Sequence, residues 1–192
     1  VFNDVRLAVK ACADVIVLDW MQGGTGATQQ VFIEHAGIPT LPSLRQAVER
    51  QPESNVAVIS VPGEYAALAA YQALSEGLHV LLFSDNVPLE KEIALKDYAR
   101  DRGLLVMGPG AGTAMIAGVG LGFANVVKPG RVGVVAAAGT GAQEVMSLLD
   151  RWGVGVSQVL GLGGRDLADD VGGRMAVPAI SALRDDPRTA AL

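Results

Sequence analysis

A glycine-rich turn between an apolar segment and a helix-forming segment is the strongest chemical signal in this chain. Residues 132–144 read VGVVAAAGTGAQE, in which four apolar residues favour a buried strand, and AQEVMSLLDRW then favours a helix. A strand that passes through glycine into a helix directs backbone N–H groups and the positive end of the helix dipole at one point. The sequence therefore predicts a site for a phosphate group or a developing anion at this turn.

Turns of similar composition follow other predicted strands. In open α/β sheets, ligands bind beyond the carboxyl ends of the strands, so several such turns at one edge favour a ligand site over ordinary turn chemistry. No GxGxxG fingerprint with a suitably placed acid follows the first strand, which disfavours ordinary NAD binding, and no GxxxxGK[ST] phosphate loop for ATP is present. The unusual turns are Met21–Gln29, Val61–Tyr65, Ser84–Pro88, Gly108–Thr113 and Ala136–Glu144.

Apolar strands alternate with helical patterns along the chain, which predicts right-handed βαβ units and a mostly parallel sheet. The predicted strands are Val15–Asp19, Val56–Val61, His79–Phe83, Leu104–Met107, Val132–Ala136 and Val156–Gly161. The predicted helices lie near Thr28–Ala36, Ser43–Gln51, Glu64–Glu76, Leu89–Arg102, Ala142–Trp152 and Arg174–Arg184. Pro and Gly in Asn125–Arg131 mark the clearest internal boundary, and a weaker one falls near Gln51–Ser54.

Composition excludes several classes of function. The chain has 192 residues, of which half are hydrophobic and 24 are glycine, as expected for closely packed parallel sheets covered by helices. A net charge of −5 gives no electrostatic footprint for nucleic acid. Cys12 is the only cysteine, so no metal site is expected, and no apolar run is long enough to span a membrane. We expect a cytoplasmic protein and, because the chain begins with Val1 and ends in a helical segment, a fragment of a longer one.

Five segments between about Asn55 and Val177 carry a resemblance to a known family, namely NVAVISVPGEYAA, GLHVLLFSDNVPLEKEIALK, GLLVMGPGAGTAMIAG, GFANVV and GLGGRDLADDVGG. Over this range the chain resembles FdrA-type proteins, which are relatives of the succinyl-CoA synthetase α subunit. The resemblance implies an α/β protein in which a Rossmann-type CoA-binding parallel sheet domain (55–127) precedes the first half of a flavodoxin-like ligase domain (128–192).

The resemblance also implies roles for individual residues. Glu144 corresponds to a catalytic glutamate that contacts a phosphohistidine, and the histidine itself would lie beyond Leu192. A β-type ATP-grasp subunit would bind ATP. The phosphate would be held by Ala138, Gly139, Thr140 and Gly141. CoA would be bound by Gly23, Gly24, Thr25, Gly26, Pro62, Gly63, Ser84, Asp85, Asn86, Gly108 and Pro109.

Some residues depart from the family pattern. Gly110 and Ala111 replace a polar pair, and Ala138 replaces a serine, which removes a hydroxyl donor. For His35 and His79 we expect packing or surface roles. Arg165 and Asp166 lie in a glycine-rich turn, where they could serve the site or form a structural pair. A solvated helix face is expected for Glu90, Lys91, Glu92, Lys96, Arg100 and Arg102.

The first fifty residues contain ADVIVLDWMQGGTGATQQVFIEHAGIPTL. This segment resembles the FMN-binding (β/α)8 domain of glutamate synthase, where the GGTGA turn lies beside the flavin phosphate. Only one or two of eight βα units are present, so no barrel can close and FMN is not expected as a cofactor. Two interpretations of residues 1–54 remain open. Val15–Asp19 and the following GGTGATQQ turn could supply the first strand and phosphate loop of the CoA domain. The favoured interpretation is a chimeric or misjoined chain with its seam between Pro39 and Ser54.

These features lead to alternative functions. The first is an ADP-forming acyl-CoA synthetase α-subunit-like protein that binds CoA and holds a phosphoryl group at a helix N-terminus. The second is an FdrA-type subunit of a carbamoyltransferase that acts on oxamate. The third is a non-catalytic assembly subunit, which the departures at Gly110, Ala111 and Ala138 favour, and a flavoenzyme fragment would be recognised by flavin absorption. Alone, the chain is expected to bind its ligands weakly and to turn nothing over.

Overall fold

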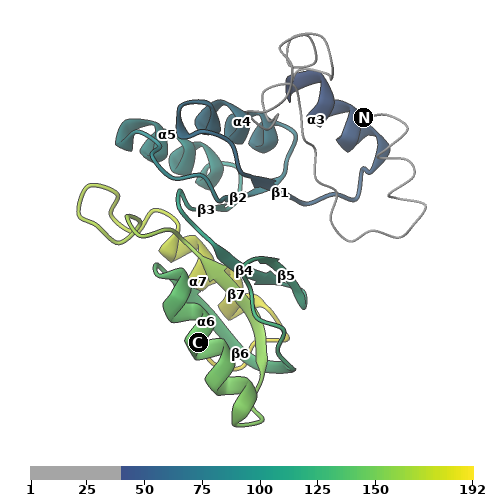
Figure 1. Ribbon diagram of the computed structural model, residues 1–192, viewed down its shortest axis with the longest axis vertical. Helices are drawn as coiled ribbons and strands as arrows, with labels where there is room; N and C mark the ends of the chain where they lie inside the picture. Colours follow the sequence, from purple (N-terminus) through teal and green to yellow (C-terminus); the bar gives the residue numbers. More distant parts are fainter. Residues whose placement is uncertain (1–39) are drawn as a thin grey trace, which may run out of the picture.

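The computed structural model describes residues 40–192, which form two sheets with helices packed against them (Figure 1). The helices are α3 (Thr40–Arg50), α4 (Gly63–Ser75), α5 (Leu89–Arg100), α6 (Gly139–Arg151) and α7 (Ala176–Asp185). The strands are β1 (Val56–Ile59), β2 (His79–Leu82), β3 (Val106–Met107), β4 (Thr113–Ile116), β5 (Val119–Gly122), β6 (Pro129–Ala136) and β7 (Val156–Gly161).

The first sheet is parallel, with the order β1-β2-β3. Its strands are short and apolar, and Val80, Leu81 and Leu82 of the central strand are fully buried, as is typical of a parallel sheet covered on both faces. Helices α4 and α5 cover the face turned away from the second sheet (Figure 1). Alanines of α4 allow that helix to pack closely, because Ala66, Ala70 and Ala73 are buried without needing much space.

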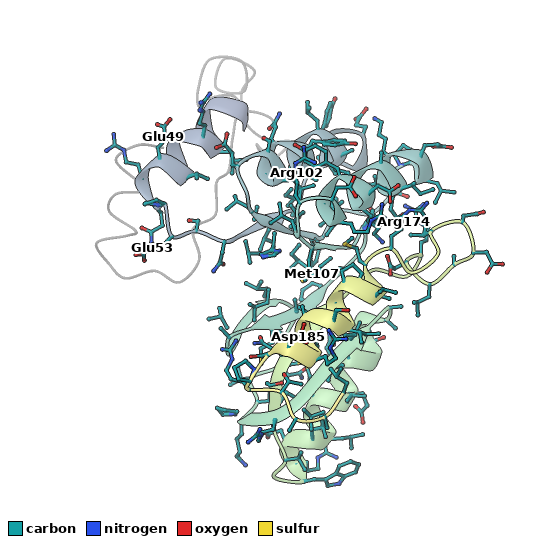
Figure 2. All side chains as sticks on the ribbon, turned by 180° about the vertical axis from the view of Figure 1, so that it is seen from behind. Glu49, Glu53, Arg102, Met107, Arg174 and Asp185 are labelled. Carbon is teal, nitrogen blue, oxygen red and sulfur yellow. The ribbon has the colours of Figure 1, made fainter. Side chains whose placement is uncertain are left out.

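The second sheet is mixed, with the order β5-β4-β7-β6. Strands β6 and β7 are parallel, whereas β4 runs antiparallel to both β5 and β7. Helices α6 and α7 lie on opposite faces of this sheet in both views (Figures 1 and 2). The α/β class with parallel strands is therefore confirmed, and the antiparallel β4–β5 hairpin is an addition that the sequence analysis did not predict.

Predicted and observed elements agree closely elsewhere in residues 40–192, with shifts of a few residues at their ends. The strand at Val15–Asp19 and the helix near Thr28–Ala36 lie outside the described residues. Strands β4 and β5 precede the predicted boundary at 125–131 but hydrogen-bond within the second sheet. The domain limits at 54 and 127 stay predictions.

One hydrophobic cluster extends across both sheets. It joins β2 and α4 to Ala114 and Leu160 of the second sheet, to Leu162 directly after β7 and to Met175 before α7. Met107 lies at the junction between the two parts (Figure 2), and it is fully buried. The two sheets therefore share a core, which fixes the turns at their edges relative to one another.

Candidate functional site

The turns that follow the three strands of the first sheet are tied together by hydrogen bonds. The Ser84 hydroxyl oxygen accepts a hydrogen bond from the backbone N–H of Val61 at 2.9 Å and donates to the carbonyl of Ile59 at 3.4 Å. The backbone N–H of Gly110 donates to the carbonyl of Ser84 at 2.9 Å. Ser84 is buried, and its side chain holds these turns in place.

Two glycines allow the backbones of these turns to approach closely. A Cβ atom on Gly63 would lie 2.3 Å from the carbonyl oxygen of Asp85, and one on Gly108 would lie 2.3 Å from the carbonyl oxygen of Leu82. Gly108 also has a φ of +117°, which L side chains rarely adopt. Pro62, Asp85 and Asn86 are exposed at this edge, and Gly63 and Asn86 lie side by side. The glycines in these turns thus allow the ends of three neighbouring strands to pack closely.

The start of α6 forms the second part of the site. Ala138 precedes the helix in an extended conformation (φ −101°, ψ 117°), and no side chain caps the helix. The first N–H groups of an α-helix lack intrahelical acceptors, and here they belong to Gly139, Thr140 and Gly141. Thr140 and Gly141 are exposed, as is Glu144 one turn further along. The geometry offers backbone donors and the positive end of a helix dipole to an anion.

The segment Gly108–Thr113 connects the two parts, because it leaves β3 and enters β4. A Cβ atom on Gly139 would lie 3.4 Å from the Thr113 hydroxyl oxygen, and one on Gly163 would lie 2.3 Å from the carbonyl oxygen of Pro109. The Gln143 side-chain amide donates to the Thr113 hydroxyl at 2.8 Å. The start of α6 is therefore anchored to the segment that also borders the first-sheet turns.

The structure brings together most of the residues predicted for the site. Those from 62–63, 84–86 and 108–109 lie at the carboxyl edge of the first sheet, and 138–141 lie beside the Gly108–Thr113 segment. Thr113 and Gln143 were not predicted as site residues. Each is a polar residue within a glycine-rich turn that the sequence analysis singled out, and that was the signal that could have found them. Gly23, Gly24, Thr25 and Gly26 lie outside the described residues. The roles of all these residues stay predictions.

The expected solvated face of α5 is wrong at two positions. Glu92 and Lys96 are buried, with exposed fractions of 1% and 0%. Lys96 Nζ lies 2.8 Å from Glu92 Oε1 and 2.8 Å from Asp166 Oδ1. The loop before α7 covers this part of the helix, and burial is tolerated because each charge meets an opposite one.

Arg165 and Asp166 do not pair with each other as the sequence analysis considered. Arg165 Nη2 lies 2.8 Å from Glu92 Oε2 and donates a hydrogen bond to the carbonyl of Val87 at 2.7 Å. The Asp166 carboxylate accepts hydrogen bonds from the backbone N–H groups of Met175 (3.1 Å) and Ala176 (2.9 Å) at the start of α7. We call Glu92, Lys96, Arg165 and Asp166 the charge cluster.

His79 has a structural contact in this fold. Its Nδ1 atom accepts a hydrogen bond from the backbone N–H of Leu105 at 3.0 Å, and burial lowers the pKa of the imidazole below 6.5. This contact agrees with the packing role expected for His79, whereas His35 lies outside the described residues. Among residues 40–192, no group of three or more His, Cys, Asp or Glu side chains is arranged to hold a metal ion. No helix in the same part of the chain could cross a membrane.

Comparison with known proteins supports two separate similarities. The chain is 51% identical over 147 residues to the uncharacterized protein YahF of Escherichia coli K12, covering 77% of this chain and 28% of that protein. It is 29% identical over 173 residues to subunit alpha 2 of an ADP-forming succinate–CoA ligase from Archaeoglobus fulgidus, covering 88% of this chain and 57% of the relative. The chain thus spans 28% of the length of YahF and 57% of the length of the ligase subunit.

The N-terminal similarity is to a different protein class. A family model described as a conserved region in glutamate synthase matches residues 1–60. A glutamate synthase large subunit-like protein of Rhizobium meliloti is 65% identical over 48 residues, which are 25% of this chain and 11% of that protein. Because the ligase match covers 88% of the chain, it extends upstream of Asn55 and overlaps this region.

Solved structures support the fold. ATP citrate lyase from Methanothrix soehngenii, in complex with citrate and coenzyme A, matches with a TM-score of 0.66 and 23% identity over 76% of this chain and 25% of that one. A dinucleotide-forming acetyl-coenzyme A synthetase from Ca. Korarchaeum cryptofilum matches with a TM-score of 0.55 and 22% identity over 71% of this chain and 30% of that one. The resemblance to FdrA-type proteins and ligase α subunits over most of the chain, and to glutamate synthase in its first third, is confirmed.

Proposed function

We propose that this chain is the α-subunit-like part of an ADP-forming acyl-CoA ligase, which binds CoA and holds a phosphoryl group. The proposal depends mainly on one observation: the turns at the carboxyl edge of the first sheet and the start of α6 border the same short segment, Gly108–Thr113. A CoA thiol and a phosphoryl group must meet in such a reaction, and adjacent sites would allow them to do so.

CoA is proposed to bind at the carboxyl edge of the first sheet. Ligands of open α/β sheets bind there, and the exposed Asp85 and Asn86 supply polar groups beside the exposed ring of Pro62. Similarity to succinate–CoA ligase α subunits supports CoA as the ligand. Gly23, Gly24, Thr25 and Gly26 are proposed to contribute a further phosphate-binding loop, and FMN is not part of the proposal.

The phosphoryl group is proposed to lie at the start of α6. Backbone N–H groups of 139–141 would bind its oxygens, and the helix dipole would lower the cost of gathering negative charge there. Glu144 is exposed one turn from this point, where it could orient a histidine supplied by another part of the full-length protein. ATP is proposed to be bound by a β-type ATP-grasp subunit, and the assembly to act in the cytoplasm without contact to nucleic acid or membrane.

Calorimetric titration of the chain with CoA tests the first part of the proposal. Asn86→Gly keeps the left-handed backbone (φ 54°) and removes a polar side chain, so we expect CoA affinity to fall about tenfold, as for the loss of one good hydrogen bond. Ala117→Gly is the matched control, because Ala117 also has a positive φ (53°) but lies in the β4–β5 turn. Equal affinity in both variants would contradict the assignment of the turn.

Titration with inorganic phosphate and carbamoyl phosphate tests the second part. Ala138→Ser places a hydroxyl at the N-cap of α6, where serine satisfies a free N–H group and can also donate to an anion. We expect measurable anion binding to strengthen in Ala138→Ser and to stay unchanged in Ala137→Ser, one residue earlier. Anion binding that is insensitive to both changes would place the phosphoryl group elsewhere.

A second proposed function, based on the resemblance to FdrA-type proteins, is a subunit of a carbamoyltransferase that acts on oxamate. The same helix end would then hold carbamoyl phosphate, and CoA would not bind. A non-catalytic assembly subunit would bind neither ligand, and the alanine at 138 favours it. Turnover by the isolated chain would contradict the expectation that it is inactive alone.

A further inference from the structure

The loop before α7 reaches across to α5 through several charged contacts. Lys96 of α5 is fully buried between Glu92 and Asp166, and its Nζ atom also lies 3.5 Å from the carbonyl oxygen of Leu162. Arg174 Nε pairs with Asp97 of the same helix at 3.1 Å. Figure 2 shows Arg174 where this loop approaches the first-sheet helices. The loop and α5 therefore form one connected unit.

Arg165 differs from the other charged residues of this loop because it contacts the backbone of the proposed CoA turn. Its Nη2 atom donates to the carbonyl of Val87 at 2.7 Å. The same atom also lies 2.8 Å from Glu92 Oε2. Glu92 Oε2 accepts no hydrogen bond, so this contact is an ion pair only. The directed hydrogen bond of the guanidinium is thus made to the turn itself, directly after Asp85 and Asn86.

The backbone that carries Arg165 is held firmly on both sides. Gly163 has a φ of +83° and packs so closely on Pro109 that a Cβ atom would lie 2.3 Å from the Pro109 carbonyl oxygen. On the other side, Asp166 is fully buried and bound by Lys96 and by the backbone N–H groups of Met175 and Ala176 at the start of α7. A guanidinium projecting from such a fixed point can define the position of the carbonyl that it binds.

We propose that Arg165 is a positioning residue that fixes the Ser84–Pro88 turn in the conformation that binds CoA. The other members of the charge cluster hold Arg165 in place. The loop that follows the second sheet's strand β7 therefore sets the geometry of a turn at the edge of the first sheet. This inference rests on the proposed function as far as the ligand is concerned. The fixing of the turn by Arg165 can be tested without any ligand.

Hydrogen exchange of the full chain provides that ligand-free test. In Arg165→Gln, we expect the backbone N–H groups of residues 83–89, apart from Pro88, which has none, to exchange about tenfold faster, as the loss of one charge-assisted hydrogen bond predicts. Arg174→Gln is the matched control, because it removes another ion pair between the same loop and the same helix but does not touch the turn. Unchanged exchange at 83–89 in Arg165→Gln, or an equal increase in Arg174→Gln, would overturn the proposal.

Titration with CoA provides the second readout. We expect about tenfold weaker affinity in Arg165→Gln and wild-type affinity in Arg174→Gln. If the turn loosens but CoA affinity is unchanged, the turn does not serve CoA and the proposal is wrong. If wild-type protein does not bind CoA at all, the proposed function fails, while the exchange data still decide whether Arg165 fixes the turn.

Arg165 is 45% exposed, so its replacement should leave the fold intact. If Arg165→Gln does not fold, hydrogen exchange of Arg165→Lys is compared with that of wild type and Arg174→Gln instead. The lysine keeps the positive charge for Glu92, but its single ammonium group lacks the planar guanidinium geometry. We expect faster exchange at 83–89 here too, by a smaller factor, and wild-type exchange would overturn the proposal.

Discussion

Replacing Lys96 by methionine should strongly destabilise the protein. Lys96 has no exposed surface, and its ammonium group lies 2.8 Å from carboxylate oxygens of both Glu92 and Asp166. Methionine fills a similar volume, so the substitution removes the charge and leaves little cavity. Two buried carboxylates then remain with Arg165 as the cation of the cluster.

The expected cost follows from that arrangement. Removing one partner of a buried ion pair typically costs about 3–5 kcal/mol, because the remaining charge stays desolvated. Two backbone N–H groups still bind Asp166, and Arg165 still faces Glu92, so we expect about 3 kcal/mol. For a chain of this size, that free energy corresponds to a fall in Tm of about 6–12 °C.

Urea unfolding of wild type, Lys96→Met, Glu92→Gln and the double variant measures this coupling. The double variant removes one charge of each sign, so it should be more stable than the sum of the single effects allows, by at least about 1 kcal/mol. A cost below about 1 kcal/mol for Lys96→Met would refute the reasoning, since surface ion pairs contribute no more than that. Additive single effects would also show that Glu92 and Lys96 do not interact as the structure indicates.

Three further predictions concern other contacts. Gly63→Ala should destabilise the protein by about 1–3 kcal/mol, because its Cβ atom would overlap the Asp85 carbonyl oxygen. The control Gly164→Ala should leave stability unchanged, because a Cβ atom there would meet no atom within 4 Å. Equal Tm values for the two variants would contradict this prediction. Because burial lowers the pKa of His79, its contribution to stability is present above pH 6.5 and falls as the pH drops below 6.5. Urea titrations between pH 7.5 and 5 should show that the free energy of unfolding depends less on pH in His79→Asn than in wild type. Hydrogen bonding from Gln158, with Arg188 nearby, lowers the pKa of Asp186 from 3.8 to about 2, so its contribution is complete above about pH 4 and is lost as the pH falls towards 2. In Asp186→Asn that acid-dependent loss should disappear from thermal scans at pH 5, 4 and 3, and an unchanged profile would contradict the assignment.

The regular elements of residues 40–192 could be predicted because each has a local signal. Apolar segments of four to six residues, such as His79–Leu82 and Val156–Gly161, alternate with helical stretches, three of which end shortly before a glycine. The β4–β5 hairpin was missed because its two-residue turn is Ala117–Gly118. Both residues have positive φ, as a tight hairpin turn requires, but alanine lacks the turn preference of asparagine or aspartate.

Some features of the candidate site likewise depend on neighbouring residues in the sequence, and others depend on residues that are distant in the sequence. The sequence alone determined the glycine turns, the strand ends that carry them and the presence of a helix after Ala136–Gly141, since backbone conformation there depends on neighbouring residues. The predicted start of that helix, Ala142, lies three residues after the observed start at Gly139. Only the tertiary structure decided that Glu92 and Lys96 are buried, because Asp166 and Arg165 reach them from a loop some seventy residues away in sequence. Burial of a charge depends on which oppositely charged groups the fold brings to it, and no pattern within α5 contains that information.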